Sequence, residues 1–104
     1  MDNQHRKISG YRELNATEIK LMNEVKALGP IIETVQLKVM AYVKEQGDEA
    51  RRVLEAQGLD AEAASEILDR LKEATPERFA ALAKTDLQTG LMYLTRAVAQ
   101  PTFF

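Results

Sequence analysis

NATEIKLMNEVKALGPIIETVQLKVMAYVKEQ, residues 15–46, is the stretch of sequence that decides the fold. Apolar residues recur through it at spacings of three and four, which is typical of one face of an α-helix. They are Ile19, Met22, Val25, Leu28, Ile32, Val35, Val39 and Tyr42. Asn15 is a good N-cap, and Glu18 follows three residues later, as a capping box requires. The stretch therefore predicts a long helix that begins just after Asn15.

Gly29 and Pro30 interrupt this pattern. A proline inside a helix removes one backbone hydrogen bond and clashes with the carbonyl four residues back, so a kink is expected there. Because the apolar spacing keeps its phase across the interruption, we predict one kinked helix over 16–46 rather than two separate helices. Gly47 is predicted to end this helix, and Asp48 to cap the next segment.

The second half of the chain also has the pattern of helices. Residues 48–74 are rich in Ala, Glu and Arg and predict a helical excursion, broken at Gly58 and capped again at Asp60. Thr75-Pro76-Glu77 is a strong helix start, because proline suits the first turn and an acidic residue suits the positive end of the helix dipole. We therefore predict a last helix over 76–99, ended by Gln100-Pro101.

These elements predict an all-α fold in a single domain over 1–104. Two long helices form an antiparallel helical hairpin, preceded by a short N-terminal segment, residues 1–14. A hairpin covers each apolar face on one side only, and the chain ends in Phe103-Phe104. The uncovered apolar surface indicates that copies of the chain associate with one another.

Composition narrows the classes of function. The chain has 104 residues, no cysteine and a net charge of -2, so it offers no thiolate metal site and no overall positive field for duplex nucleic acid. No apolar run approaches the roughly 18–20 residues of a membrane span, so no membrane partner is expected. His5, Arg6, Lys7 and Arg12 lie close together at the start, whereas acidic residues collect in the middle. This arrangement suits a compact anionic ligand bound by the N-terminal segment, residues 1–14, although a solvated basic tail has the same composition.

The residues for catalysis are missing. The single histidine, His5, has no cysteine partner, and the five glycines are scattered rather than gathered in a phosphate loop. Glu62 and Glu66 stand at helical spacing in an Ala-rich stretch, where a solvated face is the usual outcome. We therefore expect no enzyme activity, no metal site and no cofactor.

The candidate binding residues suit a ligand with phosphates and bases. Tyr11 follows a glycine and has a ring that can stack on a base, although it can equally pack on the start of the helix. Lys26 lies at the edge of the apolar face, where its stem can pack while its ammonium reaches a phosphate. The further candidates for phosphate binding are Lys7, Arg12, Arg78 and Arg96, each of which could also be an ordinary surface cation.

Three stretches of the chain resemble a known family. They are residues 2–14, with Gly10-Tyr11-Arg12-Glu13-Leu14, residues 18–26, and residues 78–101, with Arg96-Ala97-Val98-Ala99-Gln100-Pro101. Together they resemble the phage anti-CBASS cyclic-oligonucleotide sponges, which share a hairpin domain with a Thoeris anti-defence sponge.

The resemblance implies a non-catalytic protein acting in the cytoplasm of the infected bacterial host. Such a protein sequesters cyclic dinucleotides and cyclic trinucleotides, such as cGAMP, and thereby blocks CBASS immunity. It also implies interlocked dimers that build a hexamer, a dinucleotide site with Tyr11 and Lys26, and a second pocket to which Arg78 or Arg96 contributes. The family has Arg-Trp where this chain has Arg78-Phe79, so an aromatic residue is kept. Residues 48–74 are longer here, and this insertion could alter the second pocket or the hexamer contacts.

Three alternatives remain open at this point. The chain could be a sponge for glycocyclic ADP-ribose, or a structural helical adaptor whose exposed face docks a partner protein. A regulator that binds RNA or DNA is disfavoured by the net charge and by the lack of a basic helix.

Overall fold

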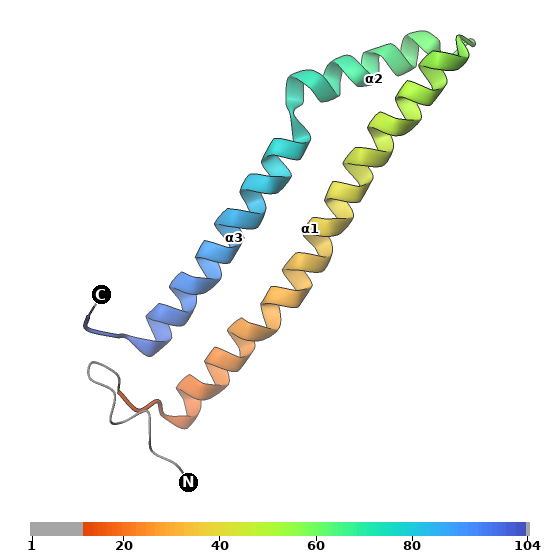
Figure 1. Ribbon diagram of the computed structural model, residues 1–104. Coiled ribbons are helices and arrows are strands. Elements are labelled where there is room, and N and C mark those ends of the chain that lie inside the picture. The colour runs from red at the N-terminus through yellow and green to blue at the C-terminus, as the bar shows by residue number, and fades with distance from the viewer. Residues whose placement is uncertain (1–11, 104) are drawn as a thin grey trace. The chain divides into compact units, whose positions relative to one another are not determined.

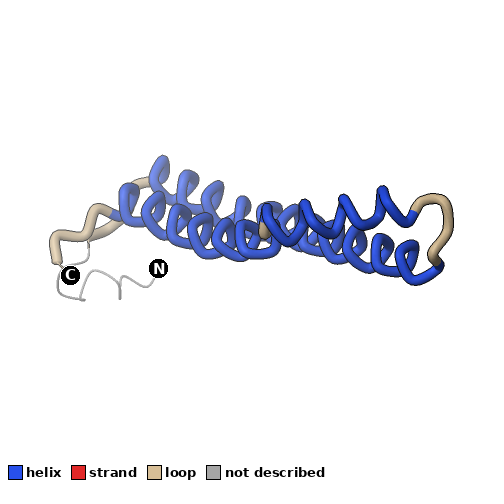
Figure 2. The backbone as a smooth tube through the Cα atoms, turned by 90° about the horizontal axis from the view of Figure 1, so that it is seen from above, coloured by secondary structure: helices blue, strands red, loops and turns tan. Residues whose placement is uncertain are grey.

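The computed structural model describes residues 12–103, and these form three α-helices with no strand among them (Figures 1 and 2). The helices are α1 (Ala16–Ala56), α2 (Ala61–Ala74) and α3 (Pro76–Ala99). The predicted all-α fold is therefore confirmed. The predictions for Lys7 and Tyr11 fall outside the described residues. None of the described helices combines the length and apolarity needed to cross a membrane.

α1 is one helix that continues through Pro30, as the unbroken phase of the pattern predicted. Its predicted end at residue 46 is wrong, because the helix runs on to Ala56. Gly47 is buried inside the helix rather than following it, and the Asp48 carboxylate accepts from Lys44 and Arg51 of the same helix. Such pairs at spacings of three and four support a helix interior, so Asp48 does not cap a new segment.

The start of the last helix is confirmed at Pro76. Thr75 separates α2 from α3 and has left-handed backbone angles, φ 46° and ψ 55°, which are uncommon for a β-branched residue. Its N–H donates to the Leu71 carbonyl, and its own carbonyl accepts from Arg78 and Phe79. Thr75 therefore closes α2 and opens α3 with one residue. Asp60 stands before α2 as predicted, but its side chain makes no capping bond.

The chain divides into two compact units, and both α1 and α3 pass from one unit to the other. Of the described residues, the first unit combines 12–32 with 86–103. The second unit is the continuous stretch Glu33–Thr85. We expected a single domain, and the units subdivide that stretch of sequence. Each unit brings a segment of α1 together with a segment of α3.

Small residues form the buried centre of the second unit. The buried residues are Val43, Gly47, Ala50, Ala64 and Ala80, so α1, α2 and α3 all contribute. Side chains of this size let helix backbones approach closely, and the Gln36 amide donates to the Ala80 carbonyl at 3.1 Å. None of the described large apolar side chains is fully buried.

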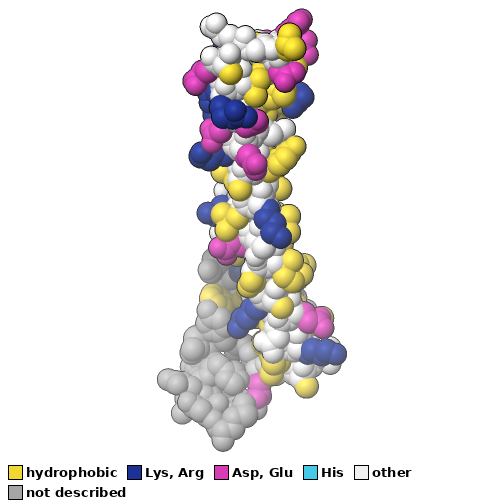
Figure 3. Space-filling view, turned by 90° about the vertical axis from the view of Figure 1, so that its right-hand side faces the viewer, with side chains coloured by type: hydrophobic (Ala, Val, Ile, Leu, Met, Phe, Trp, Pro, Cys, Tyr) yellow, Lys and Arg dark blue, Asp and Glu magenta, His cyan; other side chains and the backbone are white. Residues whose placement is uncertain are grey.

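The apolar pattern of α1 covers two faces of the helix rather than one. Met22, Val25 and Ile32 are half-buried, as predicted. The other five predicted positions are exposed, namely Ile19, Leu28, Val35, Val39 and Tyr42. The inward positions also include Gly29, Gln36 and Gly47, which an apolar count passes over. On α3, Phe79, Leu82, Leu87 and Leu94 of the predicted pattern are likewise exposed. Figure 3 shows hydrophobic side chains at the surface among the charged ones.

Candidate ligand-binding groove

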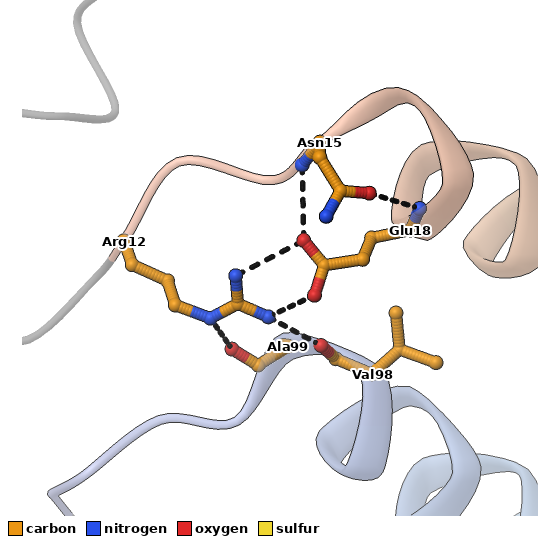
Figure 4. A network of polar contacts seen from close by, with 5 residues as sticks. All are labelled: Arg12, Asn15, Glu18, Val98 and Ala99. Atoms are coloured by element: carbon orange, nitrogen blue, oxygen red, sulfur yellow. Dashed lines mark hydrogen bonds and ion pairs between the residues drawn. The ribbon is translucent and has the colours of Figure 1, made fainter.

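The predicted capping box at the start of α1 is present (Figure 4). The Glu18 N–H donates to Asn15 Oδ1 at 2.9 Å, and the Asn15 N–H donates back to Glu18 Oε1 at 2.9 Å. Two N–H groups at the helix end are satisfied in this way. The negative Glu18 carboxylate also lies near the positive end of the helix dipole.

Arg12 joins this capping box to the far end of α3 (Figure 4). Its Nη1 and Nη2 both donate to the Glu18 carboxylate, in a two-pronged ion pair. Its Nε donates to the Ala99 carbonyl at 3.0 Å, and Nη2 donates to the Val98 carbonyl at 2.8 Å. The last carbonyls of a helix have no partner within the helix, and a cation is favourable at that end. Arg12 therefore connects the start of α1 with the end of α3 inside the first unit.

The ion pair shifts the pKa values of both Arg12 and Glu18. The hydrogen bond from Arg12, followed by the backbone N–H of Asn15, lowers the pKa of Glu18 from 4.5 to about 2. The hydrogen bond to Glu18 raises the pKa of Arg12 above its usual value. Both groups are therefore charged across the whole range in which proteins normally work.

The ion pair between Arg12 and Glu18 is expected to stabilise the fold in a pH-dependent way. A carboxylate whose folded pKa lies below its unfolded pKa contributes stability above the unfolded value, 4.5, and loses it as the pH falls through about 2. The difference in free energy of unfolding between wild type and Glu18→Gln should thus shrink between these two pH values. Urea denaturation across that range measures it, and a difference that does not change with pH would contradict the assignment.

An open groove of about 450 Å³ lies between α1 and α3 in the first unit. Two cationic side chains, Lys26 from α1 and Arg96 from α3, lie on its wall, and most of the remaining wall is apolar. The lining residues are Val25, Lys26, Gly29, Leu91, Met92, Thr95, Arg96, Ala99 and Pro101. Binding sites for small organic ligands have volumes of roughly 300–1,000 Å³ and combine apolar walls with a few polar groups.

The polar groups of the groove are partly engaged already. Arg96 Nη2 donates to the Phe103 carbonyl at 3.0 Å, which fixes the guanidinium beside the chain that follows α3. The Thr95 hydroxyl donates to the Leu91 carbonyl at 3.0 Å, so its oxygen can still accept from a ligand. Lys26 is exposed, and its ammonium is a point charge on a flexible stem. The groove thus offers positive charge above an apolar surface.

The structure brings together two of the predicted site residues and places two others outside the groove. Lys26 and Arg96 share the groove. Arg12 was predicted to bind phosphate, but its guanidinium is occupied by the ends of two helices. Arg78 belongs to the second unit and lies 5.5 Å from the centre of the Phe79 ring. Lys7 and Tyr11 lie outside the described residues.

Sequence reasoning missed several residues of the wall. Gly29 was interpreted only as a break in the helix and Pro101 only as a stop, whereas both line the groove. Met92 also lines it and is 70% exposed. Its long, polarizable side chain suits an adaptable binding surface, which is the signal that could have indicated it. Among residues 12–103, no cluster of three or more acidic or histidine side chains could hold a metal ion.

Fold and groove together define an all-helical protein with a groove that is largely apolar and carries two cationic side chains. The chain belongs to the Acb2/Tad1 hairpin-domain family, whose model matches residues 5–99. It is also similar to Anti-CBASS protein 2 of Pseudomonas phage JBD67. The two sequences are 44% identical over an alignment of 105 residues, and the match covers 97% of each chain.

Proposed function

We propose that this chain is a phage anti-CBASS protein that binds and sequesters cyclic dinucleotides and cyclic trinucleotides, such as cGAMP, in the cytoplasm of the infected bacterium. The observation that carries the proposal is the presence of Lys26 and Arg96 on one apolar groove. The name of the phage relative, Anti-CBASS protein 2, supports the biological role. The protein acts by stoichiometric binding rather than by catalysis.

The chemistry of the groove matches the chemistry of this ligand class. A cyclic dinucleotide carries anionic phosphates, which the Lys26 ammonium and the Arg96 guanidinium attract. Its bases are flat and weakly hydrated on their faces, so they pack against apolar side chains such as Val25 and Met92. The Tyr11 ring adds stacking on a base, which is worth about 1–3 kcal/mol in single-strand binders.

Self-association is part of this proposal. The exposed apolar side chains of α1 and α3 support an assembly of dimers that builds a hexamer, as the family resemblance implies. A dinucleotide with two-fold symmetry can then meet the same residues from two copies of the chain, because a two-fold interface presents each group twice.

Calorimetric titration with a panel of cyclic dinucleotides and cyclic trinucleotides tests the proposal. A sponge must bind its signal below the concentration that activates the effector, so we expect nanomolar dissociation constants. These correspond to a binding free energy on the order of -12 kcal/mol. Tyr11→Ala should weaken binding, whereas Tyr11→Phe should retain most of it, because the stacking ring is kept. Light scattering confirms that each variant keeps its oligomeric state.

The same titrations decide between this proposal and its alternatives. Glycocyclic ADP-ribose is titrated alongside the panel. Binding heat with this compound alone would assign the protein to that signal instead. No binding of any cyclic nucleotide at micromolar concentration would overturn the proposal and favour a helical adaptor. An adaptor would tolerate Tyr11→Ala and respond to substitution of exposed apolar residues such as Leu94.

A further inference from the structure

We propose that Arg12 is a positioning residue for the groove: it holds the end of α3 in place so that the groove keeps its shape. This inference rests on the proposed function of the groove as a ligand site. Arg12 itself does not line the groove. It acts through Ala99, which both lines the groove and accepts the hydrogen bond from Arg12 Nε.

The hydrogen bonds of the guanidinium leave little capacity for a ligand. Four donations are made, two to Glu18 and one each to Val98 and Ala99. At most one N–H then remains for another acceptor, so a two-pronged grip on a phosphate is excluded while these bonds persist. The planar shape of the guanidinium lets it reach a carboxylate and two carbonyls at once, which an ammonium cannot do.

The chain just after α3 depends on this contact. α3 ends at Ala99, and Gln100 has left-handed backbone angles, with φ 52°, before Pro101 returns to the groove wall. The N–H of Gln100 donates to the Arg96 carbonyl at 2.8 Å, but the Val98 and Ala99 carbonyls lie beyond the helix's own bonding pattern. Arg12 supplies donors to both, and so fixes the residue from which the turn to Pro101 begins.

Arg52 provides a matched control within the same chain. It also forms a two-pronged ion pair with a glutamate, Glu49, and both side chains are exposed. That pair lies within α1 alone, so it reaches no carbonyl of a second helix in the described contacts. Arg12→Gln and Arg52→Gln therefore remove the same charge and the same type of ion pair, but only Arg12→Gln releases the end of α3.

The experiment is calorimetric titration of the full-length protein with cGAMP for wild type, Arg12→Gln, Glu18→Gln and Arg52→Gln. We expect Arg12→Gln to weaken binding by about tenfold, similar to the loss when a residue that orients a metal ligand is removed, and Arg52→Gln to bind like wild type. Glu18→Gln should stay close to wild type, because the amide oxygen still accepts from Arg12 and the carbonyl contacts are kept. Equal losses for Arg12→Gln and Arg52→Gln would overturn the proposal, since the loss of one positive charge would then explain both.

Nuclear magnetic resonance gives a readout that stability alone does not move. In wild type, the Arg12 Nε–H should exchange slowly with solvent. The chemical shift of the Ala99 carbonyl carbon should change when Arg12 is replaced but not when Arg52 is replaced. Unchanged affinity of Arg12→Gln alongside tight binding by wild type would contradict the positioning role only. Absence of binding by wild type would instead contradict the proposed function, so the two failures are distinguishable.

Discussion

Replacing Pro30 with alanine is expected to raise the free energy of unfolding by about 3 kcal/mol, which is the usual difference between these residues inside a helix. Pro30 lies inside α1, where a proline supplies no N–H to the helix. The bond that alanine restores runs to the carbonyl of Lys26, four residues earlier. The substitution also removes the clash between the proline ring and that carbonyl.

Gly29 explains how the helix tolerates Pro30 at all. A residue before proline is normally pushed out of helical angles, because its Cβ clashes with the proline ring. Glycine has no Cβ, so the Gly29-Pro30 pair can stay helical. A Cβ at Gly29 would meet nothing within 4 Å beyond its chain neighbours and its own helix, so contacts elsewhere do not require glycine there.

Urea denaturation of wild type and Pro30→Ala measures this gain. Glu33→Ala, another exposed position of α1, serves as the control and should change the free energy of unfolding by no more than about 0.5 kcal/mol. A Pro30→Ala variant no more stable than wild type would show that α1 has already adapted to the proline at no cost. Because the change falls one turn from Lys26, ligand affinity should be measured on the same samples.

Reversing the charge of Lys26 is expected to abolish ligand binding, with a loss of affinity of at least about 100-fold. A hydrogen bond to a charged group contributes about 1.5–3 kcal/mol, and Lys26→Glu replaces that attraction with repulsion of the phosphate. The side chain is exposed, so the substitution leaves no buried charge and the fold should persist.

Lys20→Glu is the matched control for this experiment. Lys20 is an exposed lysine of α1 in the same unit, and it does not line the groove. Both variants change the net charge equally, so a general electrostatic effect would weaken binding by both. Loss of binding confined to Lys26→Glu supports a direct contact, whereas equal losses would remove Lys26 from the site.

Capping residues predicted the helix starts well, because a helix cap depends on a few residues that are adjacent in the sequence. Asn15 and Glu18 form the expected box, and the break before Pro76 falls where Thr75-Pro76-Glu77 placed it. The same reasoning was wrong at Gly47. Glycine ends a helix only where the chain turns, and here it lies in a buried position where a small residue suits helix packing.

The groove was less predictable, because it depends on contacts between segments far apart in the sequence. Lys26 was placed at the edge of the apolar face, and it does line the groove. The role of Arg12 was not predictable, since its partners Val98 and Ala99 are backbone carbonyls that no side-chain motif reveals. The inward face of α1 was also blurred, because exposed residues such as Val35 and Tyr42 share the apolar character of the packed ones.

The contact between Arg12 and Ala99 also has a consequence for the order of folding. It joins residues 87 positions apart, whereas the second unit is one continuous stretch of chain. During synthesis Arg12 has no partner on α3 until the chain has been made as far as Ala99, and closing a longer loop costs more entropy. The second unit can therefore assemble first, and the groove is completed later, when Arg12 meets the end of α3.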